Sequence, residues 1–187
     1  VHWTQAIPAE VKCEYAGIPQ GDYYTNIESA VRVQCEFPMC FERLTGYRPA
    51  TSYQVPATAY EGIAALGGEL VFPRDHQPML ANQGHVLQDT TLDAVAVPDP
   101  WQDQRFRLHL QQYQELAVRC PAQVVRGGLA GQEGPITTAG LLRGERFFED
   151  CLTRHSLAHS LLDLCTTMFI RWMQAEDAAL GVSRTVI

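Results

Sequence analysis

Long apolar runs, basic clusters and paired cysteine motifs are all missing from this sequence of 187 residues. Without an apolar run of about 18 residues, no segment has the character of a membrane-spanning helix, and no signal peptide is recognisable at the N-terminus. The net charge is −7 and no run of Lys or Arg occurs, which argues against nucleic acid or an anionic membrane surface as a partner. We therefore expect a soluble, cytoplasmic protein that binds neither.

Cysteine is too sparse for a disulfide scaffold. Six cysteines occur in the chain and none forms a Cys-x-x-Cys pair, so we expect buried thiols instead. Cys35 and Cys40 lie close together in the sequence, but no His or Cys pair at usable spacing accompanies them. The cysteines therefore give no reason to predict a metal bound within this chain.

The most informative stretch of the sequence runs from Arg126 to Phe148, and the other predicted elements are interpreted from its pattern. It follows the apolar segment 122–125, which is typical of a short buried strand, and crosses a turn rich in glycine. It then enters a segment with apolar residues at helical spacing. Strand, glycine-rich loop and helix make the βα unit of parallel α/β proteins, and the length of the chain indicates one domain.

Similar patterns predict further elements. Strands are expected at 10–15, 49–55, 69–72 and 182–187, and helices at 27–44, 105–118 and from 156 to a stop at Gly181. A short helix closed by the glycines at 67–68 precedes the third of these strands. Pro38 should end or bend its helix, and residues 16–26 have the composition of a loop. Residues 73–99 are expected to make a long excursion over one face of the domain, while Arg143 and Arg146 should face solvent.

Three segments resemble the uroporphyrinogen decarboxylase superfamily, which includes the methylcobamide methyltransferases. They read TAYEGIAALGGELVFPRDHQPML, LDAVAVPDPW and GPITTAGLLRGERFFEDCLTRHSLAHSLLDLCTTMFIRWMQAEDAALG. The resemblance covers roughly residues 20 to 187 and implies an α/β fold of the (β/α)8 TIM-barrel type. About four βα units, the first half of the barrel, would be present in this chain. The resemblance implies that a second chain or a missing C-terminal half completes the barrel, since a whole barrel needs about 250 residues.

The residues favour one branch of this superfamily. The decarboxylases use an arginine-rich loop after the first strand and an Asp after the second. Here the first of these loops is IPQGDYYTN, without Arg, and the Asp position falls on Thr58. The segment from Val55 to Gly62 instead resembles the corrinoid-dependent methyltransferases, which carry a Thr and a Glu in this region. Bidentate recognition of carboxylates by Arg has no substitute in a Tyr pair, so the methyltransferase branch is favoured.

The resemblance nominates Glu61 as the catalytic residue, which would orient a substrate or accept a proton. An equally weighted alternative is that Glu61 opens a helix, where a carboxylate suits the dipole. A corrinoid cofactor or a corrinoid protein is the implied partner. The zinc ligands of thiol-activating members belong to the second half of the barrel, so zinc would be bound only through residues outside this chain.

The remaining candidates for substrate binding are Tyr23, Tyr24, Thr58, Arg126, Gly127 and Gly134. The two tyrosines either line the mouth of the barrel or cover the edge of its core, and the glycines either approach a ligand or serve a turn. His155 and His159 have the spacing of a helical zinc site, but surface or packing roles are favoured. A decarboxylase-type lyase and a non-catalytic subunit or scaffold of a split barrel remain alternative functions.

Overall fold

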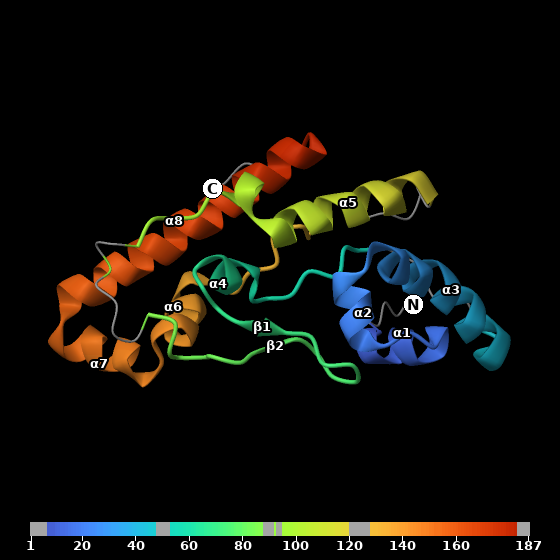
Figure 1. The fold of residues 1–187 in the computed structure, drawn as a ribbon, viewed down its shortest axis with the longest axis horizontal. Helices are drawn as coiled ribbons and strands as arrows, with labels where there is room; N and C mark the ends of the chain where they lie inside the picture. Colours follow the sequence, from blue (N-terminus) through green and yellow to red (C-terminus); the bar gives the residue numbers. More distant parts are fainter. Residues whose placement is uncertain (1–6, 48–52, 88–91, 93–94, 120–127, 183–187) are drawn as a thin grey trace. The chain divides into compact units, whose positions relative to one another are not determined.

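The computed structural model describes residues 7–47, 53–87, 92, 95–119 and 128–182, and they fall in two compact units (Figure 1). The first unit contains Val1–Pro56, Phe72–Pro78 and Leu108–Leu129. The second contains Ala57–Val71, Met79–Arg107 and Ala130–Ile187. In the described part of the chain, no helix combines the length and apolar character needed to cross a membrane.

The first unit begins with a helix where a strand was expected. The strand prediction for residues 10–15 is wrong, because this segment is α1 (Ala9–Ala16). Cys13 and Ala16 are buried on one face of α1, and they belong to a cluster that also contains Ala30 and Val33. Gly17 then adopts a left-handed conformation with φ 63°, which ends the helix. Six residues fit either a helix or a strand, and burial of this one face selects the helix.

A second short helix replaces much of the loop expected at 16–26. It is α2 (Gln20–Thr25), preceded by Pro19. A side chain at Gly21 would place a Cβ 2.7 Å from the carbonyl oxygen of Phe72, so this close approach requires glycine. The prediction of a plain loop was wrong for residues 20–25, because a proline such as Pro19 favours the start of a helix as well as a turn.

The long helix of the first unit is confirmed as α3 (Ile27–Thr45), which continues through Pro38. Its first turn is capped by Asn26, whose side chain accepts a hydrogen bond from Ser29 N at 2.9 Å. The C-terminal part of α5 (Gln104–Arg119), also expected from the sequence, contributes Leu116 to a small core with Val31. Of the two outcomes expected at Pro38, an end or a bend, the helix end does not occur.

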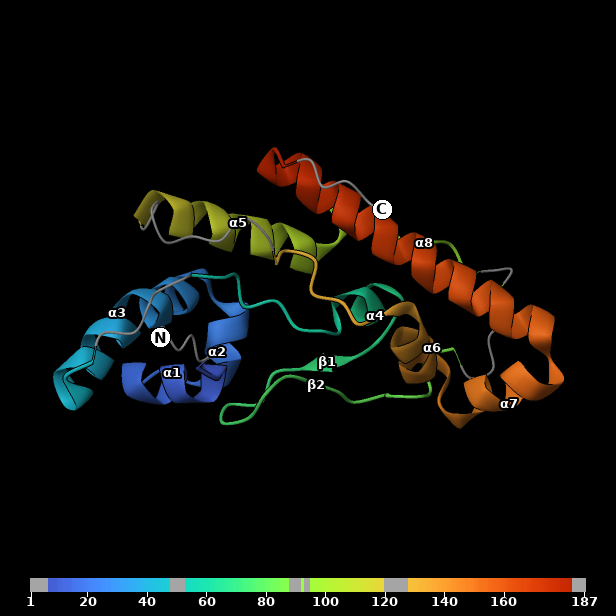
Figure 2. The same ribbon diagram turned by 180° about the vertical axis from the view of Figure 1, so that it is seen from behind.

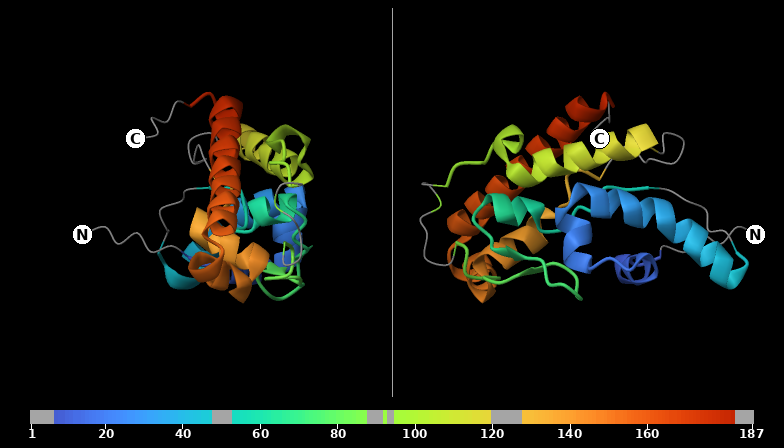
Figure 3. Two further views of the ribbon diagram at one scale, coloured as in Figure 1. Left: turned by 90° about the vertical axis from the view of Figure 1, so that its left-hand side faces the viewer. Right: turned by 45° about the vertical axis from the view of Figure 1, so that its right-hand side comes forward.

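The second unit consists of a short hairpin and helices. Its helices are α4 (Glu61–Ala65), α6 (Pro135–Arg143), α7 (Glu145–Thr153) and α8 (His155–Leu180), with the 3-10 helix η2 (Pro100–Gln102) and the first turn of α5. Strand β1 (Leu70–Val71) pairs antiparallel with β2 (Met79–Leu80), with Leu70 opposite Leu80 (Figure 2). Figure 3 shows α6 and α7 gathered at the N-terminal end of α8.

The core of the second unit lies between α8 and the segments that pack on it. Its buried members are Ile63, Leu80, Leu87, Leu92, Ala139, Leu142, Phe147, Ala158, Leu161, Leu164 and Cys165. The apolar stripe predicted for the last helix is confirmed, and Gly181 stops this helix in a left-handed conformation with φ 61°. This packing rather than helix propensity holds α8 in place.

The excursion predicted at 73–99 is anchored to α6 in the residues that belong to the second unit. Gly84 N donates to the carbonyl oxygen of Leu141 at 2.7 Å, and Leu87 N donates to that of Leu142 at 2.9 Å. Gly84 and Gly144 both have positive φ, and a Cβ at Gly144 would lie 2.9 Å from Gly84 O. The expected strand character near residues 85–87 is absent, because this segment forms turns.

Arg143 is buried, so the expectation that it faces solvent is wrong. Its Nε lies 2.5 Å from Oδ2 of Asp150, and its Nη1 donates to the carbonyl oxygen of Leu87 at 2.7 Å. Arg154, which is exposed, lies 2.5 Å from the other oxygen of Asp150. A guanidinium is tolerated in the interior because a charge and a carbonyl oxygen satisfy its donors. Arg146 is exposed, as expected.

The parallel strands of a half-barrel are largely not seen in the described residues, which are mostly helical. Of the predicted strands, only 69–72 appears, as the two-residue β1. At 49–55, residues 53–55 contain no more than an isolated bridge at Tyr53. The expected strand 122–125 and most of 182–187 lie outside the described residues.

Replacing Arg143 with Met would remove the buried partner of Asp150 and leave the Leu87 carbonyl without this donor. We expect the free energy of unfolding to fall by about 3–5 kcal/mol, the range for breaking a buried pair. The control Arg32→Met removes an exposed pair with Glu36 and should cost less than about 1 kcal/mol. Urea denaturation measures both losses, and equal losses would contradict the importance of the buried pair.

The Cys165 thiol makes stability depend on pH. Burial raises the pKa of Cys165 from 9.0 to about 12. The protonated thiol therefore stabilises the folded chain fully below about pH 9, and this contribution is lost as pH rises toward about 12. Above pH 9, the free energy of unfolding should fall less steeply with pH in Cys165→Ala than in the wild type. The two slopes should differ by up to about 1.4 kcal/mol per pH unit. Denaturation at a series of pH values tests this, with the exposed Cys151→Ala expected to keep the wild-type slope.

Candidate functional site

Two loops of the second unit meet at the centre of the candidate site. The first loop, residues 57–60, precedes α4, and the second loop, residues 130–134, precedes α6. Tyr60 and Gln132 form an antiparallel bridge, and Glu133 N donates to Ala59 O at 3.1 Å. Gly131 lies so close to the first loop that a Cβ there would fall 2.0 Å from the carbonyl oxygen of Thr58. Only glycine permits this contact between the two backbones.

Glu61 holds the first loop to the start of α5. Its side chain is 2% exposed, and its Oε1 accepts hydrogen bonds from Thr58 N at 2.9 Å and from Thr58 Oγ1 at 3.1 Å. Arg105 forms a bidentate pair with the same carboxylate, through Nη2 to Oε1 and Nε to Oε2, each at 3.0 Å. A buried carboxylate is stable in this position because charged and polar donors surround it.

The hydroxyl of Thr58 makes two hydrogen bonds in this network. Its hydroxyl donates to Glu61 and accepts a hydrogen bond from Tyr60 N at 3.1 Å. The side chain is buried, so both hydrogen-bonding capacities of the hydroxyl are used inside the protein. The structure therefore brings together two of the residues nominated from the sequence, Thr58 and Glu61.

A second buried glutamate holds the second loop to α8. Glu176 is 1% exposed, and its Oε2 accepts a hydrogen bond from Ala130 N at 2.8 Å. In α4, Gly62 faces α8 so closely that a Cβ there would lie 2.6 Å from Cε of Met168. The same Cβ would lie 3.2 Å from Cδ of Gln132. Two carboxylates and two glycines thus define how the loops, α4 and α8 fit together.

The two nominated tyrosines belong to the first unit. Tyr23 is 5% exposed, and its hydroxyl oxygen accepts a hydrogen bond from Gln34 Nε2 at 2.6 Å. Tyr24 is half-buried with its ring edge-on to that of Tyr23, at a centroid distance of 5.2 Å. Burial, reinforced by the charge of Glu10, raises the pKa of Tyr24 to about 12. These contacts match the core-edge interpretation, and contact with a substrate stays a prediction.

The glycine-rich turn is only partly visible. Arg126 and Gly127 lie outside the described residues. Gly134 precedes α6 with φ −63°, and no atom lies within 4 Å of the position of a Cβ there. Neither backbone strain nor crowding therefore requires glycine at 134. Ligand contact at Gly134 stays a prediction.

Metal ligands do not gather in the part of the chain that the structure describes. His155 and His159 are both exposed on α8, in keeping with the surface role favoured from the sequence. No group of three or more His, Cys, Asp or Glu side chains with the geometry of a metal site occurs among the described residues.

Arg105 and Glu176 were not predicted from the sequence as members of the site. A signal existed for Glu176, because it continues the spacing of Met168 and Trp172 on the buried face of α8, and a charge on an apolar face needs a partner. No local pattern marks Arg105, which lies 44 residues from Glu61. Gly131 was included in the glycine-rich turn, but its close contact with Thr58 depends on tertiary structure.

Gly131→Ala would place a methyl group against the Thr58 carbonyl oxygen. We expect it to lower the free energy of unfolding by about 1–3 kcal/mol or more, the usual cost of overpacking. The matched control is Gly134→Ala in the same loop, which should change stability by less than about 0.5 kcal/mol. Thermal or urea denaturation distinguishes them, and a neutral Gly131→Ala would show that the loops are not locked together here.

In structure, the chain is similar to a solved methyltransferase from Methanosarcina mazei. The TM-score is 0.70 at 23% sequence identity, over 96% of this chain and 50% of that chain. At this identity the likeness shows a shared fold, and the chain spans about half the length of that methyltransferase. In sequence, no curated protein gives a significant match.

A family model described as uroporphyrinogen decarboxylase (URO-D) matches residues 55–179. The matched region contains the whole network of the two loops, from Thr58 and Glu61 through Arg105 to Glu176. It also covers more than half of the 187 residues. The resemblance seen in the sequence is confirmed, and the chain belongs to the uroporphyrinogen decarboxylase family.

Proposed function

We propose that this chain provides the first half of a barrel-type methyltransferase that works with a corrinoid cofactor or a corrinoid protein. Family membership and the likeness to half of a methyltransferase support this proposal. The observation that carries it is the Thr58–Glu61–Arg105 network, which lies in the segment that resembles the corrinoid-dependent branch. The network fixes the loop ahead of α4, and in barrels of this type the loops ahead of the helices carry the active site.

Glu61 acts in this proposal as a positioning residue. Its carboxylate already accepts hydrogen bonds from both donors of Thr58 and from Arg105. These partners hold the first loop in one conformation, and such preorganisation aligns reacting groups without reorganisation during the reaction. Direct proton transfer by Glu61, the other role suggested by the sequence, would require this network to open.

The described residues do not form a corrinoid site by themselves. A methylated corrinoid, when bound, would supply an electrophilic methyl group, and a nucleophilic acceptor such as a thiolate would attack that methyl group. The close contacts of Gly62 with Met168 and of Gly131 with Thr58 fill the space directly between these segments. The corrinoid, the acceptor and any zinc would therefore bind where the rest of the barrel or a partner protein adds further residues.

Decarboxylation of a polycarboxylated tetrapyrrole is the alternative suggested by the family description. Such a substrate needs several arginines that are free to bind carboxylates. Among the described residues, the two arginines with little exposure are already paired, Arg105 with Glu61 and Arg143 with Asp150. The loop 18–26 contains no arginine. Methyl transfer is therefore the function that these residues support better.

Glu61→Gln in the completed barrel should lower kcat/KM for methyl transfer by about 100-fold, the cost of a misplacement of about 1 Å. The amide removes the charge that orients Arg105 and places an NH2 group where an acceptor is needed. The measurement is the loss of methylcobalamin absorbance together with mass spectrometry of a methylated thiol. Glu69→Gln is the control, because Glu69 is an exposed residue of the same segment and should leave the rate unchanged.

Equal rates for the two variants would contradict the role of Glu61, while methyl transfer itself would stand. The absence of turnover with any thiol or pterin acceptor would overturn the methyltransferase proposal. Rescue of a haem-deficient strain by the wild-type protein would then favour the decarboxylase, and a stable monomer without either activity would favour a scaffold.

A further inference from the structure

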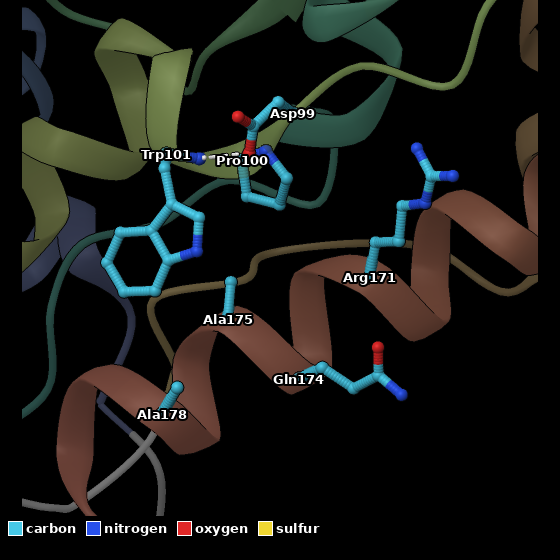
Figure 4. Close-up of a pocket in the computed structure, with 7 residues that line it drawn as sticks. All are labelled: Asp99, Pro100, Trp101, Arg171, Gln174, Ala175 and Ala178. Atoms are coloured by element: carbon cyan, nitrogen blue, oxygen red, sulfur yellow. Dashed lines mark hydrogen bonds between the residues drawn. The ribbon is translucent and has the colours of Figure 1, made fainter.

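An open surface cavity of about 350 Å³ lies between η2 and α8 in the second unit, apart from the network of the two loops (Figure 4). It is lined by Asp99, Pro100, Trp101, Arg171, Gln174, Ala175 and Ala178. Its volume is at the lower end of the range of about 300–1,000 Å³ that is typical of small-molecule sites. A ligand with one or two rings has the matching size.

Trp101 presents an aromatic surface that is both exposed and held in place. Trp101 is 45% exposed, but its backbone N donates a hydrogen bond to Oδ1 of Asp99 at 3.0 Å. The indole ring lies edge-on to Phe106, at a centroid distance of 5.5 Å and an interplanar angle of 84°, and Phe106 itself is buried. Trp101 therefore supplies a restrained aromatic surface beside the cavity, which the ring of a ligand could contact.

Arg171 provides a positive charge on the α8 side of this cavity. Its Nη1 donates to the carbonyl oxygen of Val97 at 3.1 Å, which restrains the exposed guanidinium. Within the described ranges, no carboxylate pairs with Arg171. Four further N–H donors of a guanidinium remain in the fork geometry that suits a carboxylate. The charge of Asp99 lies on the opposite side, on η2, where its oxygen accepts from Trp101 N.

Small side chains of α8 line the floor of the cavity. Ala175 lies between Arg171 and Ala178 along α8, and Ala178 lies on the Trp101 side (Figure 4). Gln174 adds an amide at the edge of the cavity. An aromatic ring can therefore lie over the alanines and against the indole, with an anionic group at its end reaching the guanidinium.

We propose that this cavity binds a small aromatic carboxylate, with its ring against Trp101 and its carboxylate on Arg171. The size of the cavity, the restrained indole and the guanidinium, which pairs with no carboxylate among the described residues, each select one part of such a ligand. The proposal goes beyond methyl transfer and does not depend on it, since none of the seven lining residues belongs to the Glu61 network.

An NMR titration with 2-naphthoate tests the site in the wild-type chain. Binding should shift the indole N–H signal of Trp101 and the backbone N–H signals of Ala175 and Ala178. The uncharged isostere 2-naphthamide should bind at least about tenfold more weakly. Signals that do not move, or equal affinities for the two compounds, would overturn the proposal without affecting the proposed methyl transfer.

Two matched pairs of variants locate the contacts. Arg171→Gln should weaken 2-naphthoate at least about tenfold and leave 2-naphthamide unchanged. Arg107→Gln should affect neither, although Arg107 is also an exposed arginine that donates to a backbone carbonyl, that of Gln102. Trp101→Leu should abolish binding of both compounds, whereas Phe148→Leu, at an exposed aromatic outside the cavity, should not. Wild-type affinity in Arg171→Gln would overturn the proposal, and the dispersion of each spectrum verifies folding.

Discussion

The bidentate pair of Glu61 with Arg105 is the interaction on which the arrangement of the second unit depends. Removing a carboxylate from water is costly, and Arg105 and Thr58 offset this cost by donating hydrogen bonds to the buried Glu61. The pair joins residues that are 44 positions apart. It therefore fixes the first loop, the start of α4 and the first turn of α5 in one geometry. Any displacement of one of these elements would leave a charge in the interior without its partner.

The same principle recurs elsewhere in this unit. Glu176 holds the second loop to α8, and the pair of Arg143 with Asp150 joins α6 to α7 and to the carbonyl of Leu87. Buried pairs of this kind add little net stability relative to apolar residues, but they penalise every alternative packing. Close backbone contacts, such as that of Gly131 with Thr58, likewise restrict the movement of one loop relative to the other. Polar pairs and glycines thus specify positions that an apolar core alone would leave adjustable.

Helices with one apolar face could be predicted from the sequence, because their apolar residues recur at helical spacing over many positions. α3, α5 and α8 were found in this way. The segment 10–15 was wrongly assigned to a strand, since six residues fit two periods and the burial of Cys13 and Ala16 on one face selects the helix. The site was half predictable. Thr58 and Glu61 are close in sequence and belong to one segment, whereas Arg105 joins them only through the tertiary fold, and no local pattern encodes such a contact.

The family match begins at Val55, after α1, α2 and α3, whereas the likeness in structure covers 96% of the chain. This difference has a physical basis. The three helices of the first unit need apolar residues at helical spacing, and many different sequences provide that pattern. The loops of the second unit need a glycine where backbones touch and a charge where its partner is buried, so few residues can replace those present. We therefore expect similarity of sequence to persist where residue identity, and not only polarity, determines the geometry, as in the two loops of the second unit.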